Sequence, residues 1–168
     1  MWGGANSDFF DGQKGDDTQF GGSEIDLFVI AVNVLHTGTD VIDGHFGNMA
    51  EGDTLDDNAT DIAVVSGTNG EDTILLAQEP TSQRLWIDYN GRPILVDWLD
   101  SAGVPLFEQI QVAGLGGDDI IGFAGAPQGP AVPAGAEALD LTQLINRSND
   151  FVGVFDGNGG GDILIGSE

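Results

Sequence analysis

The amino-acid sequence predicts an all-β protein that is rich in turns, and three observations support this prediction. Glycine occurs 27 times in 168 residues, which is about twice its usual share of roughly 7%. Aspartate outnumbers glutamate by 21 to 7, and aspartate suits turns whereas glutamate suits helix surfaces. A turn made of glycine and aspartate also recurs along the chain. Hydrophobic residues make up 40% of the sequence, which is enough for a folded core.

The net charge limits the kinds of partner that the chain can bind. Twenty-eight acidic residues face four basic residues, for a formal net charge of -24. Such a chain resists its own compaction and is repelled by nucleic acids and by anionic membrane surfaces. We therefore expect cations or basic surfaces as partners, with no nucleic acid and no anionic membrane among them.

The sequence lacks three features: cysteine, a cleavable signal peptide and an apolar run long enough for a membrane-spanning helix. It contains no cysteine, so disulfides and thiolate metal sites are excluded. Its first residues have neither the basic region nor the apolar region of a cleavable signal peptide. The apolar run 27–35 is far shorter than the roughly 18 residues that a membrane-spanning helix needs.

The recurring turn is clearest near the start of the chain, where three nine-residue units follow one another at 3–11, 12–20 and 21–29. Their sixth positions hold Asp8, Asp17 and Asp26. Three later segments, 67–75, 114–122 and 157–165, repeat the pattern with Asp72, Asp119 and Asp162. Weaker copies occur at 37–43 with Asp40 and at 148–153 with Asp150.

The spacing of the later copies predicts long repeats. The steps from Asp26 to Asp72, to Asp119 and to Asp162 are 46, 47 and 43 residues. This near-regularity suggests that the four turns lie at one corner of successive long rungs.

These units follow the template Gly-Gly-x-Gly-x-Asp-x-U-x, in which U is a large apolar residue, and the chain thereby resembles the RTX, or haemolysin-type, calcium-binding repeat proteins. The resemblance implies a right-handed parallel β-roll or β-helix, a solenoid in which Ca²⁺ ions bind between stacked turns. It covers roughly a third of the chain. Departures from the template are Asn6 and Glu24 at the fourth position, Thr68, Leu115 and Asn158 at the second, and Gln19 at the apolar position.

The resemblance implies several Ca²⁺ ions and a set of ligand residues. Glycine at the early positions permits backbone conformations that bring carbonyl oxygens together, and aspartate adds a carboxylate to them. The implied metal residues are Asp8, Asp17, Asp26, Gly70, Asp72, Gly117, Asp119, Gly160 and Asp162. The implied core residues of the repeats are Phe10, Phe28, Ile74, Ile121 and Leu164.

In such a roll two nonapeptides form one coil, so units one and three would lie on the same side. Asp8 and Asp26 would then flank one ion. Asp17 would face the other edge, where its partner eighteen residues later would be Leu35, which is not a ligand. Because the ions offset the charge of the turns, we expect metal binding and folding to be one equilibrium.

Other elements are predicted between the turns. Asn90-Gly91 stands between two apolar runs in 84–99 and predicts a hairpin insertion. The alternating stretch 107–114 predicts a strand, and the Gly/Pro-rich stretch 125–135 predicts an exposed loop. One short helix is allowed near 137–147. The whole chain, 1–168, is predicted to be a single solenoid module, with tandem nonapeptides at 3–29 and longer rungs at 30–168.

Other functions fit the sequence less well than a calcium-binding solenoid. A calcium-dependent parallel β-helix enzyme acting on polysaccharide would need basic residues at its substrate site, and an ice-binding solenoid would need ranks of Thr-x-Thr. His36 and His45 could suggest zinc, but they are typical of incidental surface residues. Aromatic residues flank the hairpin turn and could stack on sugars, although covering the hairpin is their simpler role: Trp86, Tyr89 and Trp98.

The function predicted from the sequence is therefore structural and not enzymatic. We expect a calcium-binding module of a secreted bacterial RTX-like protein, exported by a type I-like route and folded by external calcium. Residue 3 opens a repeat with no cap before it, and 163–168 stops where another turn would begin. We therefore expect further repeats in a longer parent chain, or end-to-end association of copies.

Overall fold

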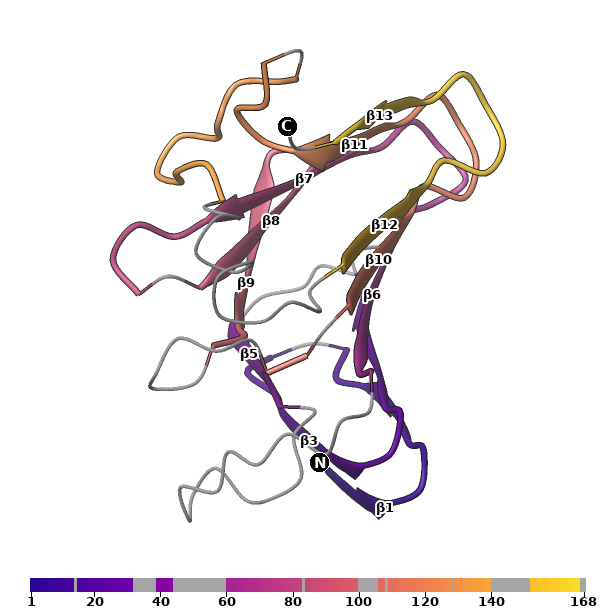
Figure 1. Cartoon of the computed structure of the whole chain (residues 1–168). Coiled ribbons are helices and arrows are strands. Elements are labelled where there is room, and N and C mark those ends of the chain that lie inside the picture. The colour runs from indigo at the N-terminus through magenta and orange to yellow at the C-terminus, as the bar shows by residue number, and fades with distance from the viewer. Residues whose placement is uncertain are drawn as a thin grey trace.

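The computed structural model of the chain describes residues 1–13, 15–31, 39–43, 60–82, 84–99, 106–107, 109–127, 129–139 and 152–166. Within these ranges the regular elements are thirteen strands in two sheets, and no helix is present. Figure 1 shows the two sheets facing each other, with the N-terminus at one end of the stack and the C-terminus at the other. In the same ranges no helix long and apolar enough to cross a membrane occurs.

Sheet A has eight strands and sheet B has five. The order in sheet A is β1 (Trp2–Ala5), β3 (Thr18–Ser23), β5 (Thr39–Asp43), β9 (Arg92–Asp97), β8 (Leu85–Tyr89), β7 (Thr73–Gln78), β11 (Ile120–Phe123) and β13 (Ile163–Ile165). The order in sheet B is β12 (Val152–Asp156), β10 (Gln109–Ala113), β6 (Ile62–Ser66), β4 (Leu27–Ala31) and β2 (Phe9–Asp11).

The chain alternates between the two sheets. Apart from the pairs that β8 makes with β7 and β9, all neighbouring strands in the two sheets run parallel. We call one strand of each sheet, with the turns that join them, a rung. One edge of the sheet pair therefore carries the turns from sheet B into sheet A, and the opposite edge carries the turns from A into B. The predicted all-β class with parallel strands is confirmed.

The hairpin predicted at 84–99 is present, and it enlarges sheet A. Strands β8 and β9 are antiparallel and lie between β5 and β7, so sheet A gains two strands that sheet B lacks. Asn90 and Gly91 form the turn with φ of 51° and 77°, the left-handed conformation at both positions that a two-residue hairpin turn requires. The strand predicted at 107–114 is β10.

The core lies between the sheets and follows the alternation of side chains along each strand. In β6 and β10 every second residue is buried, as the two-residue period of a strand requires. Phe10 and Phe28 stack with ring centroids 5.0 Å apart, and Ile74 and Ile121 are buried in the same core cluster. Leu164 differs from its predicted place in the core.

Leu164 is 49% exposed although it is in register with the buried Ile121. It lies on β13, which pairs with β11 alone and ends the order of sheet A. Its exposure therefore follows from its place on an edge strand, where only one neighbouring strand shields it.

A second, smaller apolar cluster covers the outer face of sheet A. Leu75, Ala77 and Ala124 are buried there, and Trp86 packs against them together with Val132. Residues 125–135 run as the predicted loop without a strand. Glu137 forms an isolated antiparallel bridge with Gln78 instead of beginning a helix, and residues 140–147 of the predicted helix lie outside the described ranges.

Candidate metal centre

Each repeat turn places its first glycine against its own aspartate. A methyl group on this glycine would lie within 3.0 Å of the carboxylate five residues later. Any side chain would displace the carboxylate, so the contact explains why glycine opens each repeat. The six pairs are Gly3–Asp8, Gly12–Asp17, Gly21–Asp26, Gly67–Asp72, Gly114–Asp119 and Gly157–Asp162.

Five of these six turns share a left-handed backbone at their second and fourth positions, and we call them the open turns. The second positions with positive φ are Gly4, Gln13, Gly22, Leu115 and Asn158, and the fourth are Asn6, Gly15, Glu24, Gly117 and Gly160. Such φ values cost little for glycine and more for other residues. Within the open turns, the residues that depart from the template therefore keep its backbone conformation, at some strain.

The turn 67–72 has another conformation, and we call it the closed turn. Neither Thr68 nor Gly70 has a positive φ. Thr68 instead folds over the aspartate of its own turn: its N–H and its hydroxyl donate to Asp72 Oδ2 at 2.6 Å and 3.0 Å.

The aspartates of successive rungs stack into ladders. In each step, Oδ1 of the later aspartate accepts the backbone N–H of the earlier one. One ladder on the A-to-B edge joins Asp8, Asp26 and Asp61, with both N–H to Oδ1 distances at 2.8 Å. The B-to-A edge carries the pair Asp17–Asp40, at 3.2 Å, and the ladder Asp72–Asp119–Asp162, at 2.8 Å and 3.0 Å.

The second carboxylate oxygen distinguishes three of the open turns from the closed one. In the open turns, Oδ2 of Asp8, Asp17 and Asp119 is buried without a hydrogen-bond partner. Asp119 as a whole is only 1% exposed. Burying a carboxylate oxygen unpaired is costly. These oxygens are therefore suited to bind a cation or to accept a hydrogen bond from another donor.

Asp72 of the closed turn has protein donors on both oxygens. Besides Thr68 on Oδ2, the Tyr89 hydroxyl and the Asn90 side-chain amide donate to Oδ1 at 2.8 Å and 2.9 Å. The hairpin turn thus lies where another repeat turn would stack. Asn90 also accepts the N–H of Thr73 at 2.7 Å, which ties the hairpin turn to β7.

These contacts set the protonation of the two partners. Burial raises the pKa of Asp72, but the hydrogen bonds from Thr68, Tyr89 and Asn90 outweigh it, and the net pKa lies below its usual value. Burial and the neighbouring Asp72 carboxylate raise the pKa of Tyr89. Asp72 is therefore held ionised by protein donors alone.

The structure brings together some of the predicted metal residues and separates others. Asp8 and Asp26 are neighbours, and Asp72, Asp119 and Asp162 lie on one edge. The prediction that Asp26 shares this corner is wrong, because Asp26 lies on the opposite edge. The partner of Asp17 is Asp40 and not Leu35, because the second rung is 23 residues long and places Thr18 opposite Val41.

The predicted metal residues Gly70, Gly117 and Gly160 also stack. A methyl group on Gly117 would collide with the backbone of Gly70, and one on Gly160 would collide with the carbonyl of Gly117. The turns at 114–119 and 157–162 are further joined by the N–H of Gly117, which donates to the Gly159 carbonyl at 2.9 Å. The backbones of successive turns therefore lie in direct contact at these glycines.

Asp61 is a ladder residue that the repeat pattern did not reveal. It is 1% exposed and accepts the N–H of Asp26. Five residues before it stands Asp56 and not glycine, and two residues after it stands Ala63 in the place of a large apolar residue. The remaining signal is an aspartate directly before the alternating strand 62–66.

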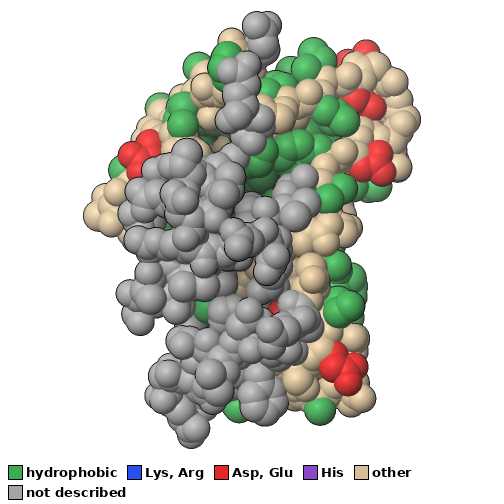
Figure 2. Space-filling model, in the orientation of Figure 1, with side chains coloured by type: hydrophobic (Ala, Val, Ile, Leu, Met, Phe, Trp, Pro, Cys, Tyr) green, Lys and Arg blue, Asp and Glu red, His purple; other side chains and the backbone are tan. Residues whose placement is uncertain are grey.

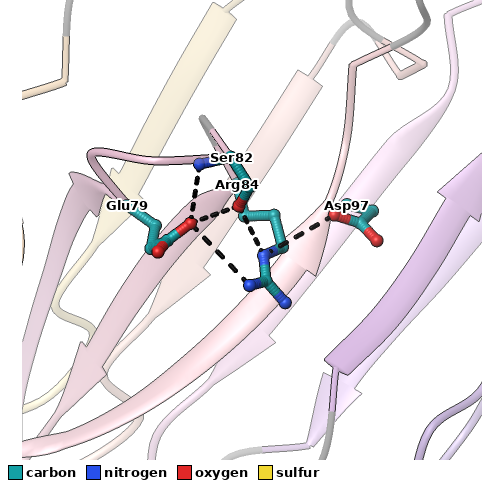
Figure 3. A network of polar contacts seen from close by, with 4 residues as sticks. All are labelled: Glu79, Ser82, Arg84 and Asp97. Atoms are coloured by element: carbon teal, nitrogen blue, oxygen red, sulfur yellow. Dashed lines mark hydrogen bonds and ion pairs between the residues drawn. The ribbon is translucent and has the colours of Figure 1, made fainter.

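Arg84 has partners outside the aspartate ladders. Arg84 pairs with Glu79 and Asp97, at 3.7 Å and 3.8 Å, and donates to the Ser82 hydroxyl, which in turn donates to Glu79 (Figure 3). None of these partners belongs to a ladder. On the face drawn in Figure 2, acidic side chains gather near the turns that lead into β7, β11 and β13.

The described residues contain no group of three or more His, Asp or Glu side chains placed to hold a metal ion. A cation bound at a turn would therefore need backbone carbonyl oxygens besides the aspartates. His36 and His45 lie outside the described residues. Trp98 is buried in the core and Tyr89 is bound to Asp72, so the three hairpin aromatic residues form no common platform. Neither a protein-family model nor a curated protein nor a solved structure matches this chain.

Proposed function

We propose that this chain is a calcium-binding module of the RTX type, a right-handed parallel β-roll that folds on binding Ca²⁺ and carries no catalytic activity. One observation carries the proposal: three of the five open turns hold an aspartate whose second oxygen is buried without a partner, namely Asp8, Asp17 and Asp119. Twenty-eight acidic residues against four basic ones leave a large charge for cations to offset.

The residues present fit calcium by the chemistry of their donors. Ca²⁺ takes six to eight hard oxygen ligands, mixed from carboxylates and backbone carbonyls, at about 2.3–2.6 Å. Stacked open turns offer both kinds of oxygen. On this proposal Asp8 with Asp26, Asp17 with Asp40, and Asp119 with Asp162 hold the ions, with carbonyls of turn residues such as Gly117 and Gly160.

Calcium fits better than magnesium or zinc. Mg²⁺ demands near-octahedral geometry and keeps several waters, whereas Ca²⁺ accepts irregular sets of protein oxygens. Zn²⁺ favours nitrogen and sulfur ligands, and the chain has no cysteine and two histidines. Turns whose ligands are aspartates and carbonyls therefore select the larger hard cation.

The closed turn needs no ion on this proposal. Thr68, Tyr89 and Asn90 already satisfy both oxygens of Asp72. We therefore assign Asp72 and Gly70 to a turn in which protein donors take the place of a cation, and we place the cations at the open turns.

Bound calcium supplies two things to this chain, namely positive charge between the ladder carboxylates and a link between successive rungs. Each ion adds stability because it binds the folded form: an ion present at 100 times its Kd adds about 2.7 kcal/mol. Several ions together shift a chain of net charge -24 from an expanded state to the folded one. Such a module would work outside the cell, as the RTX resemblance implies, where calcium is abundant.

The alternative is a calcium-dependent β-helix enzyme that acts on polysaccharide. Such an enzyme would use basic residues to bind an anionic substrate. Arg84 is instead held by Glu79, Ser82 and Asp97, so it does not present a free cation to a substrate. The binding module is therefore the better supported function.

A calcium titration followed by far-UV circular dichroism tests the proposal. The full chain is taken from chelator to millimolar CaCl₂, with MgCl₂ as the control. A cooperative gain of β signal that calcium induces and magnesium does not is the expected result. A chain already folded in chelator and indifferent to calcium would refute the proposal and favour a plain scaffold or the enzyme.

A further inference from the structure

Gln19 is a buried amide with nothing to pair it. It is the second residue of β3, at the position of the repeat where Phe10 and Phe28 fill the core. Gln19 is 0% exposed, and neither its Oε1 nor its Nε2 has a hydrogen-bond partner. Burying a polar group without a partner is costly, and an apolar residue at this position would avoid that cost.

A second unpaired group lies beside it. Oδ2 of Asp17, two residues earlier at the corner of the same rung, is also buried without a partner. Both side chains lie tightly against Gly12: a methyl group on this glycine would lie 2.8 Å from Gln19 Nε2 and 3.0 Å from Asp17 Oδ2. The amide and the carboxylate therefore meet at the same glycine, yet they form no hydrogen bond with each other.

The next rung adds a second carboxylate near this corner. Asp40 is 2% exposed, and its Oδ1 accepts the N–H of Asp17 at 3.2 Å. Gln19 itself lies opposite Ile42 in the same pair of strands. The corner thus combines two carboxylates on adjacent rungs with an amide from the core side.

We propose that Gln19 is a calcium ligand, binding through Oε1 the same ion as Asp17 at the Gly12 corner. This inference rests on the proposed function and deepens it, because it assigns a side-chain ligand outside the turn itself. Side-chain amide oxygens are common calcium ligands, and a half-turn about the last side-chain bond of glutamine exchanges Oε1 and Nε2. The polar residue at the core position of this unit is thereby explained by the carboxylate pair at its corner.

A buried water molecule is the competing partner for these two unpaired groups. Water could donate to the Asp17 carboxylate and to the Gln19 carbonyl together. It would, however, leave the charge of Asp17 buried beside that of Asp40. A cation satisfies both oxygens and offsets the charge, so we favour the ion.

Two variants of the full chain, Gln19→Leu and Gln19→Glu, distinguish the ion from the water. The number of bound Ca²⁺ ions and their affinity are measured by equilibrium dialysis against CaCl₂. We expect Gln19→Leu to bind one ion fewer, although it fills the core with an apolar side chain. We expect Gln19→Glu to keep the number of ions and to bind one of them about tenfold more tightly, because a charged ligand replaces a neutral one.

Phe10→Leu, at the same repeat position one unit earlier, is the control and should leave the number of ions unchanged. An unchanged number of ions in Gln19→Leu, together with weaker calcium binding in Gln19→Glu, would overturn the inference and indicate a buried water. If the proposed function itself were wrong, the unaltered chain would bind no calcium, so the two failures can be told apart.

Discussion

At the scale of the residue, the two carboxylate oxygens of a ladder aspartate such as Asp119 have separate roles. Oδ1 accepts the backbone N–H of the aspartate on the preceding rung, so it holds the rungs in register whether or not a metal is present. Oδ2 depends on its own turn, and in the open turn of Asp119 it is buried and unpaired. A substitution that keeps the first oxygen and removes the charge therefore tests the second role by itself.

Asp119→Asn is such a substitution. The amide oxygen can still accept the N–H of Asp72, but the negative charge is lost, so the turn loses a charged ligand. We expect the calcium midpoint of folding to rise by about tenfold or more and at least one ion to be lost.

Asp97→Asn is the matched control, because Asp97 is 46% exposed and its contact with Arg84 is 3.8 Å long. Exposed ion pairs of this kind contribute about 0–1 kcal/mol. The midpoint of this variant should stay close to that of the unaltered chain. Equal effects of the two substitutions on the calcium midpoint would show that Asp119 is no more a ligand than Asp97.

At the scale of the element, the turns and strands were predictable from the sequence because their signals are local. Asn90-Gly91 predicts the hairpin, and the glycine–aspartate units predict their turns. The register between rungs was not predictable. Asp17 meets Asp40 because the rung has 23 residues instead of eighteen, and the length of a connection is not encoded in the turn that it follows. Asp61 was missed because no glycine opens its turn.

The place of the hairpin in the stack was equally hidden from sequence patterns. Nothing local to 84–99 indicates that its turn would lie against Asp72. The contact depends on β8 pairing with β7 so that Tyr89 falls opposite Ile74. Side-chain donors from one element thus complete a ladder that belongs to another.

This role of the hairpin leads to a prediction for Tyr89→Phe, which keeps the ring and removes only the hydroxyl donor to Asp72. Hydrogen bonds to a charged group contribute about 1.5–3 kcal/mol. We expect the free energy of unfolding in urea, at saturating calcium and neutral pH, to fall by an amount of this order. The number of bound ions should not change, because the closed turn holds none.

The pH dependence of this loss has a definite sign. The pKa of Asp72 is lowered in the folded state from the ordinary value of 3.8, so its contribution is present above that value and is lost as the pH falls through the lowered pKa. The difference in free energy of unfolding between Tyr89→Phe and the unaltered chain should therefore shrink in acid. Asn90→Gly keeps the left-handed backbone but removes the amide donor to Asp72. It should show the same direction of stability loss and the same pH dependence as Tyr89→Phe. Loss of an ion in Tyr89→Phe would instead show that Asp72 binds calcium.

At the scale of the whole molecule, two kinds of interaction hold the rungs together. The core between sheets A and B is apolar and continuous from Phe10 to Ile121. The edges carry stacked carboxylates, whose mutual repulsion grows as each rung is added. Apolar burial therefore favours the stack while the edges oppose it, and the balance depends on the cations available.

The size of the chain in solution reports this balance directly. A compact chain of 168 residues has a radius of gyration of about 15 Å, and an unfolded one of about 43 Å. Small-angle X-ray scattering in chelator should give a value well above the compact one, and millimolar calcium should bring it close to the compact one. Sodium chloride at about 1 M screens charge to roughly 3 Å, but it links no rungs, so it should contract the chain only in part. If sodium chloride alone gave the full contraction, general screening and not specific calcium binding would be what the ladders require.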